Sequence, residues 1–492
     1  MSPKLTIDNI PDEVLLDIFD SYRQHFTHGH SLWNRKHKWF KLIHVCRRWR
    51  CIIFASSTRL DLCLSMSTSN PNSVATIFLP HLSLLPIAIK HHYLPVGTDP
   101  HVKTEEFGCM QAALKSYNRV RGITFSGTAP DFDELFKATK CPFPMLEDLE
   151  LRNLDSGIAE LKVPATFLDG SAPHLRRLKL YRISLTSISS LLSTTTMLFE
   201  LCLRIYTTSA SLLAHLQDMH CLRHLNLRPR TRGAPSSIDG PMPPTNPENT
   251  SLLSKLISFH YQGPSSVLSA LVAGFTAPSL QGLHIILDGD DESPIFHLPR
   301  FLDDVEKVYH SVQMISEGDY FRVSLLTHSE TVDCATPSFR FCSKVSPDSV
   351  MGMSAALSAK LATVEELLMV FLTDFYEMWD NDTPWRNFLQ HFRKVKVLRV
   401  ELEDVFAIAD TLQMDDEPIP DLLPMLEEVE ITARGDVFPE SPPQGQPVMF
   451  SEPEMAAFRP FLAARQEAGH PVKISRSQKA KFPNQNLFVL FG

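Results

Sequence analysis

Histidines are the first residues whose type and spacing suggest chemistry. His25, His28 and His30 lie close together, His37 follows them, and His91-His92 forms a pair. A structural zinc site needs four ligands in tetrahedral geometry, and no Cys-x-x-Cys pair in the sequence accompanies these histidines. We interpret the cluster as a solvated loop, with zinc ligation as the alternative. We predict no metal and no cofactor.

Two acidic runs, Asp288-Gly289-Asp290-Asp291-Glu292 and Asp415-Asp416-Glu417, suggest calcium. Neither has the alternating oxygen ligands and distant glutamate of a calcium loop, so we interpret both as solvated turns. The sequence also contains no P-loop, dinucleotide-binding glycine fingerprint or nucleophile elbow. We predict a non-catalytic protein; the alternative is an enzyme hidden in residues 290–390.

Composition narrows the class of partner. The 43% hydrophobic and 21% charged fractions are typical of a folded protein that does not cross a membrane. A net charge of only -9 over 492 residues, with both signs interspersed, provides no strong field for nucleic acid or an anionic membrane surface. The first residues lack a secretory signal pattern, and nine cysteines without a pairing pattern suit a reducing compartment. We therefore expect a cytoplasmic or nuclear protein.

The first elements that must be positioned are two amphipathic helices near the start of the chain. Ile10-Pro11-Asp12-Glu13 is typical of a helix start, because proline suits the first turn and carboxylates favour the positive end of the helix dipole. Apolar residues at helical spacing follow, and after a polar stretch, Arg23–Lys38, a second apolar helix is predicted over Trp39–Ile53. So short a segment hides little apolar surface by itself, which favours a partner or a neighbouring domain.

These two segments resemble an F-box. Ile10-Pro11-Asp12-Glu13-Val14-Leu15-Leu16-Asp17-Ile18-Phe19 and Val45-Cys46-Arg47-Arg48-Trp49-Arg50 look like its Leu-Pro-x-Glu start, Ile-Phe pair and Val-Cys-Arg-x-Trp helix. The resemblance implies binding to the Skp-family adaptor of cullin-RING ubiquitin ligases, and through it to a cullin. The implied adaptor contacts are Ile10, Pro11, Val14, Leu15, Ile18, Phe19, Val45 and Cys46, with Trp49 in the core of the module.

Two features depart from the F-box pattern. Ile10 stands where leucine is usual, and Arg23–Lys38 is a long insertion between the helices. The alternative interpretation is that these are two core helices of a larger N-terminal domain.

A six-residue unit with apolar first, fourth and sixth positions recurs from Val120 onward. The units start at residues 120, 146, 175, 198, 222, 280, 395 and 426; the first five are 26, 29, 23 and 24 residues apart. This period resembles that of leucine-rich repeats, about 20 to 29 residues. Each unit would end in a short strand covered by a helix or turn, such as Thr186–Thr194 or Ser209–Met219. The predicted fold is α/β: short parallel strands on one face and helices on the other.

The domain boundaries follow from these patterns. We predict an F-box module at 1–62, a linker and cap at 63–116, repeats at 117–228, a Pro-rich flexible loop at 229–250, degenerate repeats at 251–438 and a C-terminal cap at 439–492, with a helix over Glu452–Ala468. Around 290–390 the signal fades to Val305-Glu306-Lys307-Val308 and Val364-Glu365-Glu366-Leu367, and a non-repeat insertion is the alternative there. The whole layout resembles the expanded F-box families of mushroom-forming fungi.

The repeats predict a protein-binding surface. The middle residue of each L-x-L end points away from the core, so we expect Glu150, Lys179, Cys202, Asn226, His284, Arg399 and Glu430 to line a concave face that holds a target protein. Solvated strand positions without a ligand are the alternative for each. The predicted function is a substrate receptor of a ubiquitin ligase; the alternative is a leucine-rich-repeat interaction scaffold without a ligase role.

Overall fold

The computed structural model describes residues 9–24, 42–56, 64–67, 86–91, 100–155, 157, 160–204, 209–229, 251–287, 297–303, 305, 308–317, 320–327, 339–344, 347–371, 383–413, 422–432 and 456–477. The chain divides into two compact units, Met1–Thr207 and Thr208–Gly492. The histidine cluster at residues 25–37, both acidic runs, and nearly all of the predicted Pro-rich loop lie outside the described residues.

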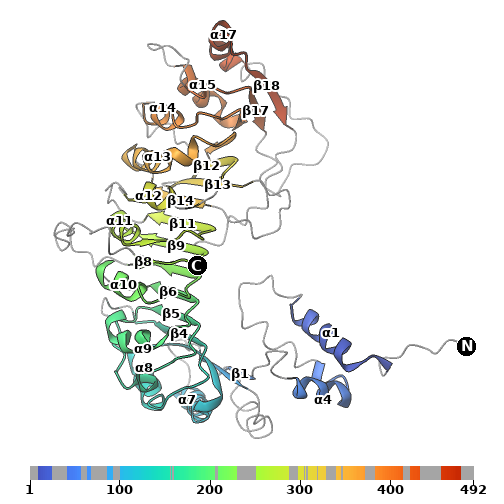
Figure 1. Cartoon of the computed structure of the whole chain (residues 1–492), viewed down its shortest axis with the longest axis vertical. Helices are drawn as coiled ribbons and strands as arrows, with labels where there is room; N and C mark the ends of the chain where they lie inside the picture. Colours follow the sequence, from blue (N-terminus) through green and yellow to red (C-terminus); the bar gives the residue numbers. More distant parts are fainter. Residues whose placement is uncertain are drawn as a thin grey trace, which may run out of the picture. The chain divides into compact units, whose positions relative to one another are not determined.

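The first unit contains the two N-terminal helices and a parallel sheet (Figure 1). The helices are α1 (Asp12–Gln24) and α4 (Arg47–Ala55). The strands pair in chain order, each parallel to the next: β1 (Leu64–Ser67), β2 (Ile87–His91), β3 (Val120–Gly127), β4 (Asp148–Asn153), β5 (Arg177–Tyr181) and β6 (Glu200–Arg204). One face of this sheet carries α7 (Pro100–Leu114), α8 (Ala129–Ala138) and α9 (Ser189–Thr194).

The second unit contains a longer sheet with helices along one face (Figure 1). In spatial order its strands are β7 (His224–Leu227), β9 (Ser258–Gly263), β11 (Gly282–Leu287), β14 (Phe339–Lys344), β13 (Tyr320–Leu326), β12 (Ser311–Glu317), β15 (Glu366–Phe371), β16 (Val397–Glu401), β17 (Glu428–Thr432) and β18 (Lys473–Ser477). The helices are α10 (Ser209–Leu216), α11 (Ser265–Gly274), α12 (Leu298–Asp303), α13 (Pro347–Leu361), α14 (Thr383–Leu389), α15 (Val405–Gln413) and α17 (Arg459–Glu467). A separate short pair joins β8 (Ser251–Leu252) to β10 (Phe275–Thr276).

The six-residue units form these strands because their apolar positions share one face. In the unit that leads into β4, Leu146, Leu149 and Leu151 are at most 1% exposed, and the first, fourth and sixth residues of the other units are buried in the same way. Burying a leucine side chain stabilises the fold by about 1.5–3 kcal/mol, and no repeat buries its own face alone. The parallel strands, repeated apolar units and one-sided helices confirm the predicted leucine-rich-repeat architecture within each unit.

The region of weak signal is both an insertion and a continuation of the repeats. β12, β13 and β14 pair with one another in antiparallel fashion, while β14 lies parallel to β11 and β12 lies parallel to β15. The candidate unit at Val364 is a repeat, since Val364, Leu367 and Met369 are all buried. The candidate at Val305 is out of register: Val308 is 63% exposed, and the apolar unit that leads into β12 starts at Tyr309.

Both ends of the chain hold more strand than the sequence suggested. β1 and β2 lie in residues expected to form a linker and cap, and they extend the parallel sheet of the first unit. In the predicted C-terminal cap, the first residues of the expected helix, 452–455, lie outside the described residues, α17 covers the later part, and β18 follows and pairs parallel with β17. Gly469 ends α17 with a φ of +82°, a left-handed conformation that suits glycine.

Candidate protein-binding surfaces

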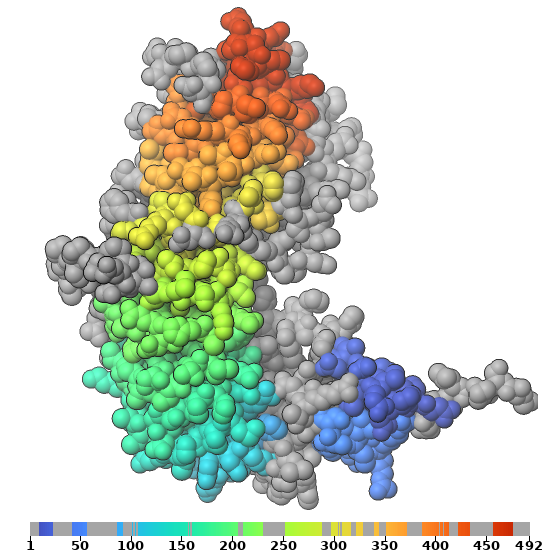
Figure 2. Space-filling view, viewed as in Figure 1, coloured from blue at the N-terminus to red at the C-terminus, as the bar shows by residue number. Residues whose placement is uncertain are grey.

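The N-terminal helices form a core of their own. Leu15, Leu16, Phe19, Ile43, Ile52 and Ile53 make one buried cluster, and Trp49 packs against it with its ring centroid 4.8 Å from that of Phe19. The blue residues of α1 and α4 form one contiguous block in Figure 2. Leu15 and Phe19 were predicted at the adaptor contact, but at 1% and 2% exposure they present almost no surface to a partner. Their burial places them, with Trp49, inside the module.

Beside this core, three aliphatic side chains remain uncovered. Val14 and Ile18 on α1 are each 46% exposed, and Val45, just before α4, is 56% exposed. Val14 and Ile18 are four residues apart, so they lie one helical turn from each other on the same side of α1. Pro11 is exposed, while Ile10 and Cys46 are half-buried. The predicted adaptor residues therefore divide into an exposed group and a buried group.

Arg48 connects the two helices at the start of α1. Its Nη2 donates to the backbone carbonyl of Ile10 at 2.6 Å and to Oδ1 of Asp12 at 2.6 Å. Cys46 acts at the other helix, where its Sγ accepts a hydrogen bond from the backbone N–H of Trp49 at 3.5 Å and caps α4. These contacts set the position of the Ile10-Pro11 turn relative to α4.

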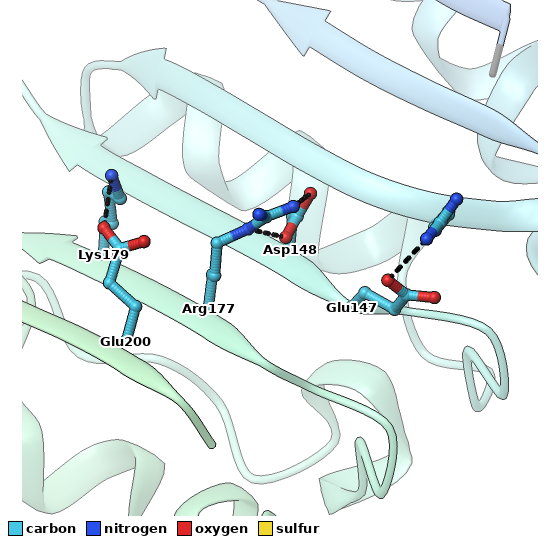
Figure 3. Close-up of polar contacts among 6 residues, drawn as sticks. Glu147, Asp148, Arg177, Lys179 and Glu200 are labelled. Carbon is cyan, nitrogen blue, oxygen red and sulfur yellow. Dashed lines mark hydrogen bonds and ion pairs between the residues drawn. The ribbon is translucent and has the colours of Figure 1, made fainter. Parts of the chain in front are cut away.

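The polar face of the first sheet is the face opposite its helices. There the predicted residues Glu150, Lys179 and Cys202 lie in register on adjacent strands. Charged side chains on and beside this row form ion pairs between neighbouring repeats: Lys179 with Glu200 at 2.7 Å, Arg121 with Glu147 at 2.9 Å, and Arg177 with Asp148 (Figure 3). Most of the charge on this face is thus already neutralised within the fold.

Tyr181 occupies the next position along β5. The Arg152 guanidinium lies over its ring at 4.3 Å, and its hydroxyl lies 3.8 Å from the Cys202 Sγ. Burial, reinforced by nearby Cys202 and Glu150, raises the pKa of the Tyr181 phenol well above its usual range, so the hydroxyl stays protonated at neutral pH. An aromatic ring, a thiol and a paired arginine make this an amphipathic patch of the kind that proteins use to contact one another.

On the second sheet, the equivalent row contains two histidines side by side. Asn226, His260, His284 and Arg340 lie in register on β7, β9, β11 and β14. The His260 and His284 rings meet edge to face with centroids 4.4 Å apart. Burial, followed by Arg228, lowers the pKa of His260 to about 4; burial, followed by His260 and the arginines around it, lowers the pKa of His284 to about 3. Both imidazoles are neutral at pH 7.

Further along the same face, Arg399 binds two carboxylates. Its Nη1 donates to Glu366 at 2.6 Å and its Nε donates to Glu430 at 2.6 Å, so one guanidinium on β16 links β15 and β17. The two predicted residues Arg399 and Glu430 are therefore partners of each other. Between the histidine row and this arginine, the face becomes apolar, with Ile315, Leu368 and Val370 forming a small buried cluster.

His260 and Arg340 are members of the row that the sequence pattern missed. His260 is the fifth residue of the unit Leu256-Ile257-Ser258-Phe259-His260-Tyr261. Aromatic residues fill the fourth and sixth positions of this unit and are fully buried. Arg340 lies between Phe339 and Phe341, which are also buried. Admitting tyrosine at the sixth position would have found His260, whereas Arg340 belongs to a segment with Thr336 at the first position, which the apolar pattern does not match.

The described residues present few features that suggest a metal site or a membrane segment. Within the described ranges, no three His, Cys, Asp or Glu side chains gather as metal ligands. His91 stacks on Phe125, with ring centroids 4.8 Å apart. None of the described helices is both long enough and apolar enough to cross a membrane.

No family model and no curated protein match the chain. Among solved structures, the chain is similar to an internalin (inlF) from Listeria monocytogenes, at 12% identity over 77% of this chain and 83% of that one, with a TM-score of 0.24. It is also similar to the leucine-rich repeat-containing protein LegL7 from Legionella pneumophila, at 11% identity over 69% and 80%, with a TM-score of 0.23. The architecture is defined by the strand pairing within each unit.

Proposed function

We propose that this chain is a substrate-receptor subunit of a Skp-cullin-F-box ubiquitin ligase. The observation that carries the proposal is the uncovered apolar group of Val14, Ile18 and Val45 above a module core that is already sealed. An isolated exposed aliphatic residue is ordinary, but two on one side of α1 and a third just before α4, in the segments that resemble an F-box, suit a docking surface.

In this proposal, the exposed residues of the module contact the adaptor. Pro11, Val14, Ile18 and Val45 bind it directly, and Ile10 and Cys46 contribute the part of their side chains that remains accessible. Leu15, Phe19 and Trp49 act indirectly, because they hold α1 against α4. Arg48 holds the Ile10-Pro11 turn in place through its hydrogen bond to the Ile10 carbonyl.

The repeats supply the second half of the function. Glu150, Lys179, Cys202, Asn226, His284, Arg399 and Glu430 all belong to strand faces that carry no helix, and these faces bind the target protein. Ubiquitin transfer is carried out by partner subunits, so the chain itself needs no catalytic group. The ligase assembly places the protein in the cytoplasm or nucleus.

Adaptor binding by the full-length chain tests this proposal. The double variant Pro11→Ala/Ile18→Asp places a charge at one of the three exposed aliphatic positions, and a carboxylate buried at an interface without a partner costs enough to weaken binding by more than about tenfold. Ile18 is 46% exposed, so the change leaves the module core intact. Purified Skp-family adaptor and isothermal titration calorimetry provide the measurement.

Val308→Asp is the matched control, because it introduces the same charge at an aliphatic residue that is 63% exposed outside the module. It should bind the adaptor like the unaltered chain. If neither variant changes adaptor affinity, or if the unaltered chain does not bind the adaptor, the ligase role fails and the repeats act as an interaction scaffold alone.

A further inference from the structure

The histidine row differs from the rest of the polar faces in its balance of charge. β7, β9, β11, β13 and β14 contain no aspartate or glutamate, yet they carry His260, His284, Arg322 and Arg340 on one face, with Arg228 directly after β7. In the first unit, by contrast, Arg177 and Lys179 are paired with Asp148 and Glu200. His260, His284 and Arg340, with Arg228 beside them, form a strip of basic residues whose positive charge comes from the two arginines.

Arg340 and Arg399 show this contrast within one row of the second sheet. The Arg399 guanidinium is held by Glu366 and Glu430 at 2.6 Å each. No carboxylate in the described part of the chain forms an ion pair with Arg340. The charged groups that lower the pKa of His284 are His260, Arg340, Arg322 and Arg228, so each such group in the described part of the chain is a basic residue.

Two polar atoms in the row are also without hydrogen-bond partners. Asn226 Oδ1 and His260 Nε2 are buried and unpaired, although each side chain is partly accessible. A buried polar atom without a partner costs about 1–3 kcal/mol, which a hydrogen-bonding group of a ligand would offset. An amide oxygen accepts hydrogen bonds, so Asn226 suits a ligand that brings N–H donors as well as negative charge.

We propose that the strip of Asn226, His260, His284 and Arg340, with Arg228 beside it, binds an acidic, extended segment of the target protein. This deepens the proposed function and rests on it, since it names the chemistry of the segment that the receptor holds. Peptide N–H groups supply donors to Asn226, and aspartate or glutamate side chains bind the guanidinium groups of Arg228 and Arg340. The neutral imidazoles of His260 and His284 lie between Asn226 and Arg340, and each donates one N–H to the segment.

The sheet geometry sets the spacing of the acidic residues. β7 and β14 are separated by three strand spacings of about 4.8 Å, so Arg228 and Arg340 lie on the order of 15 Å apart. An extended chain advances about 3.3 Å per residue, so two acidic residues about four positions apart match this distance. A segment that crosses the strands with that spacing engages both arginines and passes over the histidines.

A peptide fits the strip better than a nucleic acid does. The neighbouring cluster of Ile315, Leu368 and Val370 is apolar, and the face beyond it carries Glu366 and Glu430. A polyanion would need a long continuous positive track, whereas the whole chain carries a net charge of -9. The positive region is therefore long enough to bind two carboxylates but too short to follow a phosphate backbone.

Fluorescence anisotropy with defined peptides tests the proposal on the full-length chain. The probe is a fluorescein-labelled Gly/Ser peptide of about ten residues with two glutamates four positions apart. It should bind more tightly than the same peptide with serine at both positions or with the glutamates adjacent. Arg340→Gln should weaken its binding about five- to tenfold, because a charge-assisted hydrogen bond is lost.

Arg300→Gln is the matched control, since that arginine is exposed on α12, away from the strand face, in the same unit. It should bind the probe like the unaltered chain. Equal loss in both variants, or equal binding of the serine peptide, overturns the proposal. A phosphoserine peptide or an oligonucleotide that binds where the diglutamate peptide does not would also overturn it.

The outcome is separable from the ligase role. Pro11→Ala/Ile18→Asp should weaken adaptor binding by more than about tenfold and leave peptide binding unchanged, whereas Arg340→Gln should weaken peptide binding about five- to tenfold and leave adaptor binding unchanged. Loss of peptide selectivity with intact adaptor binding would therefore refute the strip alone.

Discussion

The imidazole ring of His260 meets that of His284 edge to face across β9 and β11, with centroids 4.4 Å apart. Both rings are partly buried, and within the described part of the chain the charged groups that shift their pKa values are basic residues. The pair therefore folds in the neutral form, and adding a proton to either ring opposes burial and like charge together.

Acidification should loosen this part of the second sheet. The folded pKa values of about 4 and about 3 lie below the ordinary value of 6.5, so the unfolded chain binds protons more readily. The stabilisation is complete above about pH 6.5 and is lost as the pH falls toward the folded values. Between pH 7 and 5, the opening free energy of β9 and β11 should fall on the order of 1–2 kcal/mol per histidine.

Hydrogen exchange of the β9 and β11 amides, corrected for the intrinsic pH dependence of exchange, measures this effect. His284→Gln should remove part of the pH dependence. β16 and β17 contain no histidine and serve as the internal reference. A loss of protection of equal size in all four strands would contradict the assignment to the histidine pair.

Arg48→Gln should lower the affinity for the adaptor while changing the folding stability of the two-helix module little. The Arg48 and Asp12 side chains are 32% and 56% exposed, so their ion pair contributes at most about 1 kcal/mol. The hydrogen bond to the Ile10 carbonyl, by contrast, positions the turn that carries Pro11. We expect several-fold weaker adaptor binding, measured by calorimetry. Asp12→Asn should have little effect, and a larger effect from Asp12→Asn than from Arg48→Gln would contradict this division of roles.

Arg465→Leu should destabilise the C-terminal end of the second sheet. Arg465 is 1% exposed, and its Nη2 lies 3.2 Å from the Leu423 carbonyl, 3.1 Å from that of Pro424 and 3.4 Å from that of Leu426. Leucine leaves these carbonyls buried without a donor, at a cost of about 2–4 kcal/mol. Hydrogen exchange in β17 and β18 should rise accordingly, while Ala463→Leu, on the exposed side of α17, should leave it unchanged.

Exchanging the charges of Asp148 and Arg177 should test the ion pairs of the first sheet. Asp148→Arg alone places like charges on adjacent strands and should cost about 1–2 kcal/mol, after allowance for partial solvent exposure. Adding Arg177→Asp should restore most of the loss. Hydrogen exchange of the β4 and β5 amides provides the measurement, and additive effects of the two changes would show that the pair contributes nothing.

The repeated strands could be predicted because their pattern is redundant. Leucines such as Leu175, Leu178 and Leu180 mark the first, fourth and sixth positions, and several units agree on the same period. The strand of His260 was not predicted because Phe259 and Tyr261 take the fourth and sixth positions. β18 was not predicted because Arg476 takes the sixth position. The antiparallel pairing of β13 escaped it because alternating apolar residues read the same in either strand direction.

The N-terminal module shows what a helical stripe alone leaves undecided. Val14 and Leu15 are neighbours in sequence and both belong to the predicted apolar stripe, yet one is 46% exposed and the other 1%. The difference depends on where α4 packs against α1. A pattern within one helix predicts that a face is apolar, whereas the second helix decides which part of that face is left for a partner.

The antiparallel excursion through β12, β13 and β14 contains two reversals of chain direction, and this even number matters. A single reversal would have left every later strand running the opposite way, with its helix unable to continue along the same face. Because β14 returns to pair with β11, the residues between these two strands form a closed detour. Loss of β13 alone would remove one reversal and turn β14 antiparallel to β11, so the two reversals can be removed only together.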